Sequence, residues 1–314
     1  MISVLLATHN SHPGRLGRTV DALCAQTLDT TSWELIVTDN ASSPPLNLSS
    51  LNVPASVNVR LVREDKPGLI HARMAGIMTS VGDIILFCDD DTVLDADYLA
   101  FSAALFEADS RLGNAAGQSL PNFEITPPDW VREFADCLAL RDFGDECRVI
   151  EGTLNGYPSF AFGGGGAAFR RAALALFEAR YADSSGPILT GRSGTSLASG
   201  EDNTLVLSVL EAGWKVGYFP ELTLTHLIPA GRLETAYLGR LNRGIAKSWV
   251  EVLGLHDICP WTPAAPWTLP LRKARSYLRN RAWAGPAEYV RWQGACGHFE
   301  GRASLNRIRA RHAA

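Results

Sequence analysis

The sequence lacks the features that mark several large classes of protein. Its six cysteines are scattered and none forms a C-x-x-C pair, so neither a disulfide framework nor a cysteine-based zinc site is indicated. No apolar run reaches the ~18 residues that a membrane-spanning helix needs. The apolar opening turns polar at Thr8 and has no basic leader, which disfavours a signal peptide. We therefore expect a cytoplasmic protein with reduced thiols, in which any membrane contact is peripheral.

Strand-like and helix-like segments alternate along the chain, and 46% of its 314 residues are hydrophobic. The patterns predict strands at residues 2–7, 33–38, 57–62 and 83–88, and helices at about 16–28, 69–79 and 98–112. After a Pro-rich loop at 121–129, they predict helices at 170–180 and 201–212, a strand at 216–226, and further helices interrupted at 260–270. Such alternation predicts an α/β fold, with a mostly parallel sheet flanked by helices and a helical C-terminal appendage.

Charge is distributed unevenly around a net value of −4. From Arg272 to the end there are ten Lys or Arg and two acids, which gives +8 and leaves −4 − 8 = −12 on residues 1–271. The basic segment also carries apolar and aromatic residues, namely Leu271, Tyr277, Leu278, Trp283, Tyr289 and Trp292. Two interpretations stay open: an interfacial helix at an anionic membrane surface, or a packing or self-association element with a solvated basic face.

Three aspartates, Asp89, Asp90 and Asp91, directly follow the apolar run at 83–88. Adjacent carboxylates repel one another unless a cation or hydrogen-bond donors offset their charge. Hard oxygen ligands suit Mn²⁺ or Mg²⁺, and either ion can hold a diphosphate. Polar residues also follow the runs at 2–7 and 33–38, and ligands of α/β sheets bind beyond the carboxyl ends of the strands. The alternative for the triplet is an acidic turn that caps a helix.

Six motifs occur in an order and spacing that carry a resemblance. They are SVLLATHN at 3–10, ELIVTDNAS at 34–42, GLIHAR at 68–73, DDD at 89–91, GGGGAAFRR at 163–171 and GED at 200–202. Together they resemble the inverting glycosyltransferases of family two, which have the GT-A fold. The resemblance covers residues 1–230. It implies a nucleotide-sugar-binding part at 1–115 and an acceptor side at 116–230. The residue pattern and charge predict a separate basic helical region at 231–314.

The resemblance implies a donor-binding set on the first half of the chain. Its members would be Thr8, Asn10, Asp39, Arg73, Asp89 and Asp90. Asp91 would bind the metal, with His226 as a second ligand. The alternatives are strand-end capping for the polar residues, a surface ion pair for Arg73 and a core histidine for His226. The family often has Asn after the arginine, where this chain has Met74, so no side-chain contact is expected from that position.

Further roles are implied on the acceptor side. Gly164 and Gly165 would let the backbone approach a sugar; no Lys-Ser/Thr follows the glycines, which argues against a phosphate loop. Asp202 would act as the general base, oriented by Glu201, although acidic residues at a helix start are also common for electrostatic reasons. On the donor side, Arg232 would neutralise the departing diphosphate, and a loop at 184–200 would order over the donor.

These observations predict a metal-dependent transferase that moves a sugar from a nucleotide-diphosphate donor, with UDP as the expected nucleotide, to a glycan or lipid-linked glycan. Nucleic acid is not an expected partner. A sugar nucleotidyltransferase is one alternative, but residues 11–15, SHPGR, poorly match the Gly-rich basic loop of that class. A sugar-binding protein with a decayed transferase fold is another. The residue pattern leaves the sugar, the base and the acceptor open.

Overall fold

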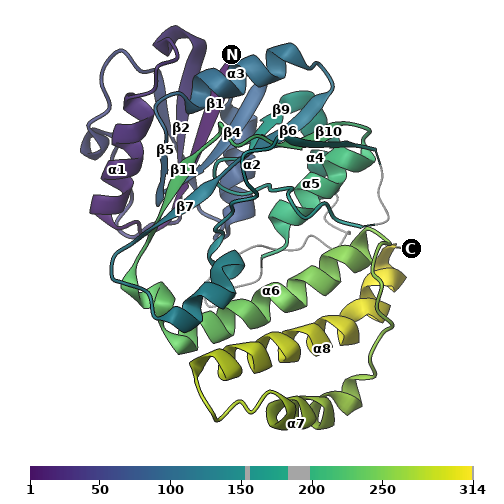
Figure 1. The fold of residues 1–314 in the computed structure, drawn as a ribbon. Coiled ribbons are helices and arrows are strands. Elements are labelled where there is room, and N and C mark those ends of the chain that lie inside the picture. The colour runs from purple at the N-terminus through teal and green to yellow at the C-terminus, as the bar shows by residue number, and fades with distance from the viewer. Residues whose placement is uncertain (153–155, 183–198, 313–314) are drawn as a thin grey trace. The chain divides into compact units, whose positions relative to one another are not determined.

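The computed structural model describes residues 1–152, 156–182 and 199–312. Within this part of the chain, eight strands form one sheet in the order β3-β2-β1-β4-β9-β6-β10-β8, and three more form a small sheet in the order β5-β11-β7 (Figure 1). Contacts divide the chain into two compact units. The first comprises residues 1–122, 141–179 and 205–227, and the second comprises 123–140, 180–204 and 228–314.

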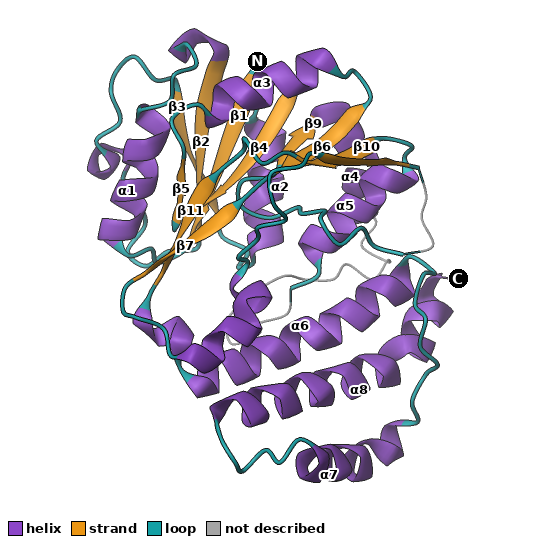
Figure 2. Ribbon diagram, in the orientation of Figure 1, coloured by secondary structure: helices purple, strands orange, loops and turns teal. Residues whose placement is uncertain are grey.

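The strands of the large sheet are β1 (Ile2–Thr8), β2 (Trp33–Asn40), β3 (Val59–Glu64), β4 (Ile84–Asp89), β6 (Leu112–Ala116), β8 (Arg148–Glu151), β9 (Ala168–Arg170) and β10 (Lys215–Tyr218). The small sheet contains β5 (Thr92–Leu94), β7 (Ser119–Phe123) and β11 (Leu224–Ile228). Helices of the first unit are α1 (Pro13–Cys24), α2 (Leu69–Thr79), α3 (Tyr98–Ala108) and α4 (Ala175–Ala182) (Figure 2). α4 extends beyond the unit by its last three residues.

Strands β3, β2, β1 and β4 are parallel neighbours. Alternate residues of a strand face opposite sides of the sheet, and both sides are buried here. Val4 and Leu6 pack into a core with Leu16 and Val20 of α1 and with Leu99 of α3. Leu5 faces the other side, where Gly76 of α2 lies so close that a Cβ on it would be 3.2 Å from Leu5 Cδ1. This two-sided burial confirms the predicted α/β class.

Several expected elements differ from the structure. The helix expected at 98–112 ends at Ala108, and β6 begins at Leu112. Gly113 of β6 lies beneath Trp214, because a Cβ on it would be 2.5 Å from Trp214 Cβ. A small residue is suitable at this contact with a distant part of the chain. The local sequence pattern around residue 113 gives no sign of the contact. Residues 119–123, partly expected as loop, form β7 despite Pro121, and the strand expected at 216–226 is two strands in different sheets.

The second unit is helical. Its long helices are α6 (Thr235–Leu255) and α8 (Pro286–His312), with α7 (Leu269–Arg279) beside α8 (Figure 1). α6 and α8 approach closely because Gly297 has no side chain: a Cβ on it would be 2.0 Å from the carbonyl oxygen of Arg243. A 3-10 segment at Asp129–Leu138 packs Val131 and Phe134 into a core with Leu238 of α6 and Val290 of α8. No described helix is long and apolar enough to span a bilayer.

Helix α5 (Glu201–Glu211) begins with residues of the second unit and continues with residues of the first. Just before it, the backbone N–H of Ser199 donates to Oγ of Ser248 on α6, 3.2 Å away, and both residues belong to the second unit. The loop expected at 184–200 to cover the donor lies almost wholly outside the described residues.

Candidate active site

The aspartate triplet lies at the carboxyl end of β4, as the sequence predicts. Asp89 is the last residue of β4 and pairs in register with Ala7 of β1. The next residue of β1, Thr8, is buried, and its hydroxyl donates to Oδ2 of Asp90 at 2.6 Å. The parallel register thus brings a predicted donor-site threonine against a predicted donor-site aspartate.

Asp91 and His226 are brought together by the small sheet. In the antiparallel pairing of β5 and β11, His226 stands opposite Thr92, the residue after Asp91. The backbone N–H of Leu227 donates to the carbonyl of Asp91 at 2.8 Å. His226 Nε2 lies 3.5 Å from Asp91 Oδ2, and both side chains are buried.

This pair fits a divalent cation in ligand type. A carboxylate oxygen and an imidazole nitrogen are suitable for Mn²⁺, and Mg²⁺ commonly takes only one or two carboxylates with phosphate oxygens and water as its other ligands. Among the described residues, no group of three or more His, Cys, Asp or Glu side chains could hold a metal ion. A cation here would therefore need further ligands from a bound diphosphate or from water.

Arg73 is a buried cation beside the triplet. Its Nη2 lies 3.4 Å from Oδ1 of Asp89, and its guanidinium stands over the ring of Phe87 at 4.7 Å from the centroid. The side chain is only 2% exposed, so the surface ion pair considered from the sequence is excluded. Arg73 is carried by α2 and held against the end of β4. Its positive charge there offsets part of the negative charge of the carboxylates.

The glycine run packs against the end of β4. A Cβ on Gly165 would lie 2.7 Å from Oδ2 of Asp89, so this position accepts a side chain only if the carboxylate moves. Gly166 has φ +90°, a conformation that favours glycine, and its carbonyl accepts a 2.5 Å hydrogen bond from the buried hydroxyl of Tyr98. The carbonyl of Gly164 accepts from the N–H of Ala167. The run therefore brings bare backbone next to the first aspartate.

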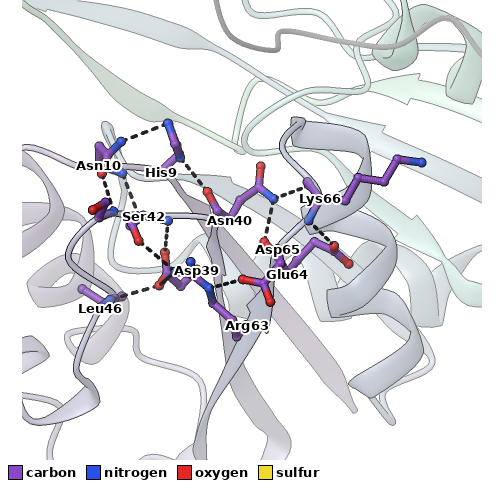
Figure 3. A network of polar contacts seen from close by, with 11 residues as sticks. His9, Asn10, Asp39, Asn40, Ser42, Leu46, Arg63, Glu64, Asp65 and Lys66 are labelled. Carbon is purple, nitrogen blue, oxygen red and sulfur yellow. Dashed lines mark hydrogen bonds and ion pairs between the residues drawn. The ribbon is translucent and has the colours of Figure 1, made fainter.

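Asp39 is the centre of a second polar network, shown in Figure 3. Its carboxylate accepts from the backbone N–H groups of Ser42 and Leu46 at 3.2 and 3.0 Å, and from Nη1 of Arg63 at 2.6 Å. Burial acts to raise the pKa of Asp39, but these hydrogen bonds outweigh it and the pKa is lowered. Asp39 thus holds residues 42–46 and Arg63 in place.

Asn10 and Asn40 extend this network across the strand ends (Figure 3). Oδ1 of Asn10 accepts from the N–H of Ser43 at 2.9 Å, and its own N–H donates to Oγ of Ser42 at 2.8 Å. Asn40 Nδ2 donates to the carbonyls of Glu64 and Lys66, while its Oδ1 accepts from the N–H of Gly68. Asn40 therefore fixes the turn that leads into α2, the helix that carries Arg73.

Three predicted residues belong to the second unit. Glu201 is buried at the start of α5, where its Oε2 accepts from the N–H of Gly200 at 3.1 Å. Asp202 is the next residue of the same first turn and is partly exposed. Arg232 lies in the short 3-10 turn Ala230–Leu233 and is partly exposed. The roles of these three residues in catalysis stay predictions.

Sequence reasoning assigned no role to Arg63, Asn40 or Tyr98, although each holds a part of the site. Arg63 stands opposite Asp39 in the register of β2 and β3, so aligning the two predicted strand ends could have suggested the pair. Asn40 lies inside a recognised motif. Tyr98 carries no such signal, because its contact with Gly166 spans 68 positions of sequence.

Comparison with curated proteins finds relatives of one kind. The chain is 24% identical over 233 residues to an N-acetylglucosaminyltransferase of Azorhizobium caulinodans, covering 73% of this chain and 55% of the relative. It is 23% identical over 232 residues to the protein of the same name from Bradyrhizobium diazoefficiens, covering 73% and 45%. The chain thus spans about half the length of these relatives.

Solved structures share the fold. S. aureus TarS 1–349 in complex with UDP-GlcNAc matches with a TM-score of 0.53 at 14% identity, over 98% of this chain and 91% of that one. GalNAc-T7 with UDP, GalNAc and Mn²⁺ matches with a TM-score of 0.54 at 16% identity, over 96% and 55%. At these identities the likeness establishes the fold, and it confirms the GT-A prediction.

A family model settles the wider relationship. The model described as glycosyl transferase family 2 matches residues 3–176. This range runs from the first strand through the aspartate triplet and the glycine run. It covers more than half of the chain and contains five of the six motifs on which the resemblance rests. The chain therefore belongs to glycosyl transferase family 2.

Proposed function

We propose that this protein is an inverting, metal-assisted glycosyltransferase that uses a UDP-sugar, with UDP-GlcNAc as its donor. The observation that carries the proposal is the convergence of Thr8, the aspartate triplet, Arg73 and His226 at the ends of β1, β4 and the β5–β11 pair. Membership of the family and the names of the N-acetylglucosaminyltransferase relatives support transfer of a sugar. The UDP-GlcNAc complex of TarS supports this choice of donor.

In this proposal the donor lies along the carboxyl edge of the large sheet. The Asp39 network and Asn10 would border the nucleoside. Asp39 would hydrogen-bond the base or the ribose. Asp89 and Asp90 would face ribose and sugar hydroxyls, and Arg73 would offset the negative charge of the donor. Gly164 and Gly165 would present backbone to the sugar, because a side chain at Gly165 would collide with Asp89.

Asp91 and His226 would hold a divalent cation, Mn²⁺ or Mg²⁺, which would stabilise the charge that builds on the diphosphate oxygens. Their 3.5 Å separation and their buried position support a shared task. Asp91 directly precedes β5 and His226 lies within β11, and together they offer a carboxylate oxygen and an imidazole nitrogen to a cation.

The chemical step is a single displacement. The oxygen of an acceptor hydroxyl forms a bond with the anomeric carbon while the bond from that carbon to the diphosphate oxygen breaks, and its electron pair leaves with the UDP. Asp202 takes the proton of the hydroxyl, since a sugar hydroxyl is a weak nucleophile until its proton is being removed. Glu201 would orient Asp202, and Arg232 would neutralise the departing UDP. Inversion at the anomeric carbon follows.

We further propose that the acceptor is a glycan or lipid-linked glycan, reached at the inner face of a membrane. Residues 1–230 would form the catalytic domain, with donor binding at 1–115 and the acceptor side at 116–230, and residues 231–314 would form an accessory helical region. Self-association through that region is the competing proposal for its basic surface.

The proposal is tested at Asp91. Asp91→Ala should abolish Mn²⁺-dependent binding of UDP-GlcNAc, because the diphosphate loses the cation that compensates its charge. Isothermal titration with UDP-GlcNAc, with Mn²⁺ and with EDTA, measures the effect. Asp83→Ala is the matched control, because Asp83 is an exposed aspartate just before β4. Equal donor affinity in wild type and Asp91→Ala at saturating Mn²⁺ would overturn the metal assignment.

Product analysis separates the remaining alternatives. Incubation with UDP-GlcNAc and an acceptor glycan should release UDP and leave the new linkage in the inverted anomeric configuration, as read by NMR. Formation of UTP and GlcNAc-1-phosphate when pyrophosphate is added to the donor would indicate a nucleotidyltransferase. Binding of the donor with neither transfer nor hydrolysis, in the presence of Mn²⁺, would indicate a non-catalytic sugar-binding protein.

A further inference from the structure

Helix α7 exposes an apolar stripe on the surface of the second unit. Trp267, in the 3-10 turn just before the helix, is 82% exposed, and Leu271 and Leu278 are 74% and 66% exposed. Ala274 is exposed between them. These four positions follow the spacing i, i+4, i+7 and i+11, which places them along one face of a helix. Trp283, 57% exposed, lies just beyond the end of α7.

All the charged residues of the segment that carries this stripe are basic. Residues 258–287 contain five Lys or Arg and no Asp or Glu. Lys273 is paired with Glu300 of α8, its Nζ 2.5 Å from Oε1. Arg275 and Arg279, by contrast, are exposed. Arg275 follows Leu271 by four residues and Arg279 follows Arg275 by four, and on a helix this spacing sets the two arginines in a row next to the stripe.

The face opposite the stripe is firmly attached to α8. Tyr277 of α7 contacts Trp292 at 5.1 Å between ring centroids, in an edge-to-face arrangement. The indole N–H of Trp292 donates to the carbonyl of Lys273 at 3.1 Å, and Arg272 stands over the ring of Phe299 at 6.0 Å. The structure therefore uses the aromatic residues Tyr277 and Trp292 for packing and leaves Trp267, Leu271 and Leu278 outside.

We propose that this surface docks onto an anionic lipid bilayer, with α7 lying parallel to the membrane plane. We call it the α7 surface and define it by Trp267, Leu271, Leu278, Arg275 and Arg279. Leucine and tryptophan side chains settle at the boundary of headgroups and acyl chains, and neighbouring arginines attract anionic headgroups. Charge complementarity selects the bilayer: a segment of 30 residues without one acid attracts anionic headgroups, whereas a symmetric contact with the same segment of a second copy would set like charges against each other.

The sequence left two interpretations of this segment open, a membrane-surface helix and a packing element. Each now applies to a different set of residues. Tyr277 and Trp292 pack the helical region, whereas the stripe and its arginines face outward. The α7 surface lies in the second unit alone and does not depend on the proposed sugar transfer. Vesicle binding can fail while transfer holds, and transfer can fail while vesicle binding holds, so the two proposals are separately falsifiable.

Flotation of the full chain with vesicles tests the proposal. Vesicles of phosphatidylglycerol and phosphatidylcholine should carry the protein upward at low salt, and vesicles of phosphatidylcholine alone should not. Arg275→Gln/Arg279→Gln should weaken binding about thirty-fold, the factor expected when two basic residues stop attracting an anionic surface. Leu271→Ser/Leu278→Ser should weaken it by at least about ten-fold, because less apolar surface enters the bilayer.

Matched controls lie outside α7. Met78→Ser/Val81→Ser changes two residues that are 82% and 65% exposed, and Arg18→Gln/Arg132→Gln removes two exposed arginines outside α7. Both should keep wild-type flotation, and circular dichroism should show all variants folded. Absence of flotation with anionic vesicles at low salt would overturn the proposal. So would a change of molar mass from dimer to monomer in Leu271→Ser/Leu278→Ser, measured by light scattering without lipid, because the stripe would then serve a second copy.

Discussion

The strand ends of the first unit and helix α7 of the second unit use charged residues in opposite ways. At the strand ends the charges are paired within the protein: buried Asp39 is held by Arg63 and two backbone N–H groups, and buried Arg73 is held against the partly exposed Asp89. In the second unit Arg275 and Arg279 of α7 lie exposed beside an apolar stripe. Buried charges depend on fixed geometry, since few water molecules can replace a lost partner. Exposed charges act through the summed field and weaken with salt.

This difference predicts which changes are severe. A substitution at a buried strand-end charge should alter binding or folding steeply and respond little to salt. A substitution on α7 should be mild and strongly dependent on salt. The start of α5 is a third case, because Glu201 is buried while its neighbour Asp202 is partly exposed.

The largest effect is expected at Asp202. Asp202→Asn should keep affinity for UDP-GlcNAc but lower kcat by at least ~10², since the amide cannot take the acceptor proton. Steady-state kinetics and titration of the donor measure the two properties separately. Asp129→Asn is the control, because Asp129 is also acidic in a first helical turn of the second unit and is exposed. A fully active Asp202→Asn would move the base elsewhere, with Glu201→Gln as the next variant.

The next effect is expected at the glycine run. Gly165→Ala places a methyl group where only 2.7 Å separates it from Asp89 Oδ2, so the carboxylate must turn away from its present position. Donor affinity should fall about ten-fold, which corresponds to ~1.4 kcal/mol. Gly17→Ala on α1 is the control, because nothing lies within 4 Å of a Cβ there. Unchanged donor affinity in Gly165→Ala would show that Asp89 does not contact the donor.

A smaller effect on stability is expected in the Asp39 network. Asp39→Asn should lower the free energy of unfolding by about 2 kcal/mol, because charged hydrogen bonds to Ser42, Leu46 and Arg63 are weakened. Urea denaturation gives the value. Asp65→Asn tests specificity, since Asp65 also binds Arg63 but is 84% exposed and should contribute little. Equal losses in both variants would contradict the view that burial makes Asp39 important.

The smallest effect concerns the stability of the fold at acidic pH. Glu34 is buried in β2, and although burial acts to raise its pKa, hydrogen bonds from Ser3, Val81 and Arg60 lower it from 4.5. A carboxylate with a lowered folded pKa stabilises the fold above its unfolded pKa and loses that contribution as the pH falls through the folded value. Melting temperature should therefore decline as the pH falls below about 4.5, and Glu34→Gln should reduce this decline. Glu107→Gln, at an exposed glutamate on α3, should behave like wild type.

The fold and much of the first unit's site could be predicted from local patterns. Continuous apolar runs marked β1, β2 and β4, and parallel strands necessarily bring their carboxyl ends to one edge, so Thr8 and Asp90 could be expected to meet. The strand β6 could not be predicted in this way, because its mostly small residues resemble the end of a helix. The contact of Gly113 with Trp214 gives a reason for the glycine in this strand. β10 and β11 were merged for a related reason: the chain between them turns from one sheet into another.

The family, the α/β class, the aspartate triplet and the basic character of the last segment could all be recognised in the amino-acid sequence, because each is carried by residues close together in the chain. Which charges are neutralised within the protein depends instead on contacts between residues far apart in the chain. The pairing of Arg63 with Asp39 and of His226 with Asp91 depends on strand register, and the division of α7 into a packed and an exposed face depends on α8. Contacts between distant residues set burial, and burial decides whether a charge is a fixed part of a site or an exposed group that solvent and salt can screen.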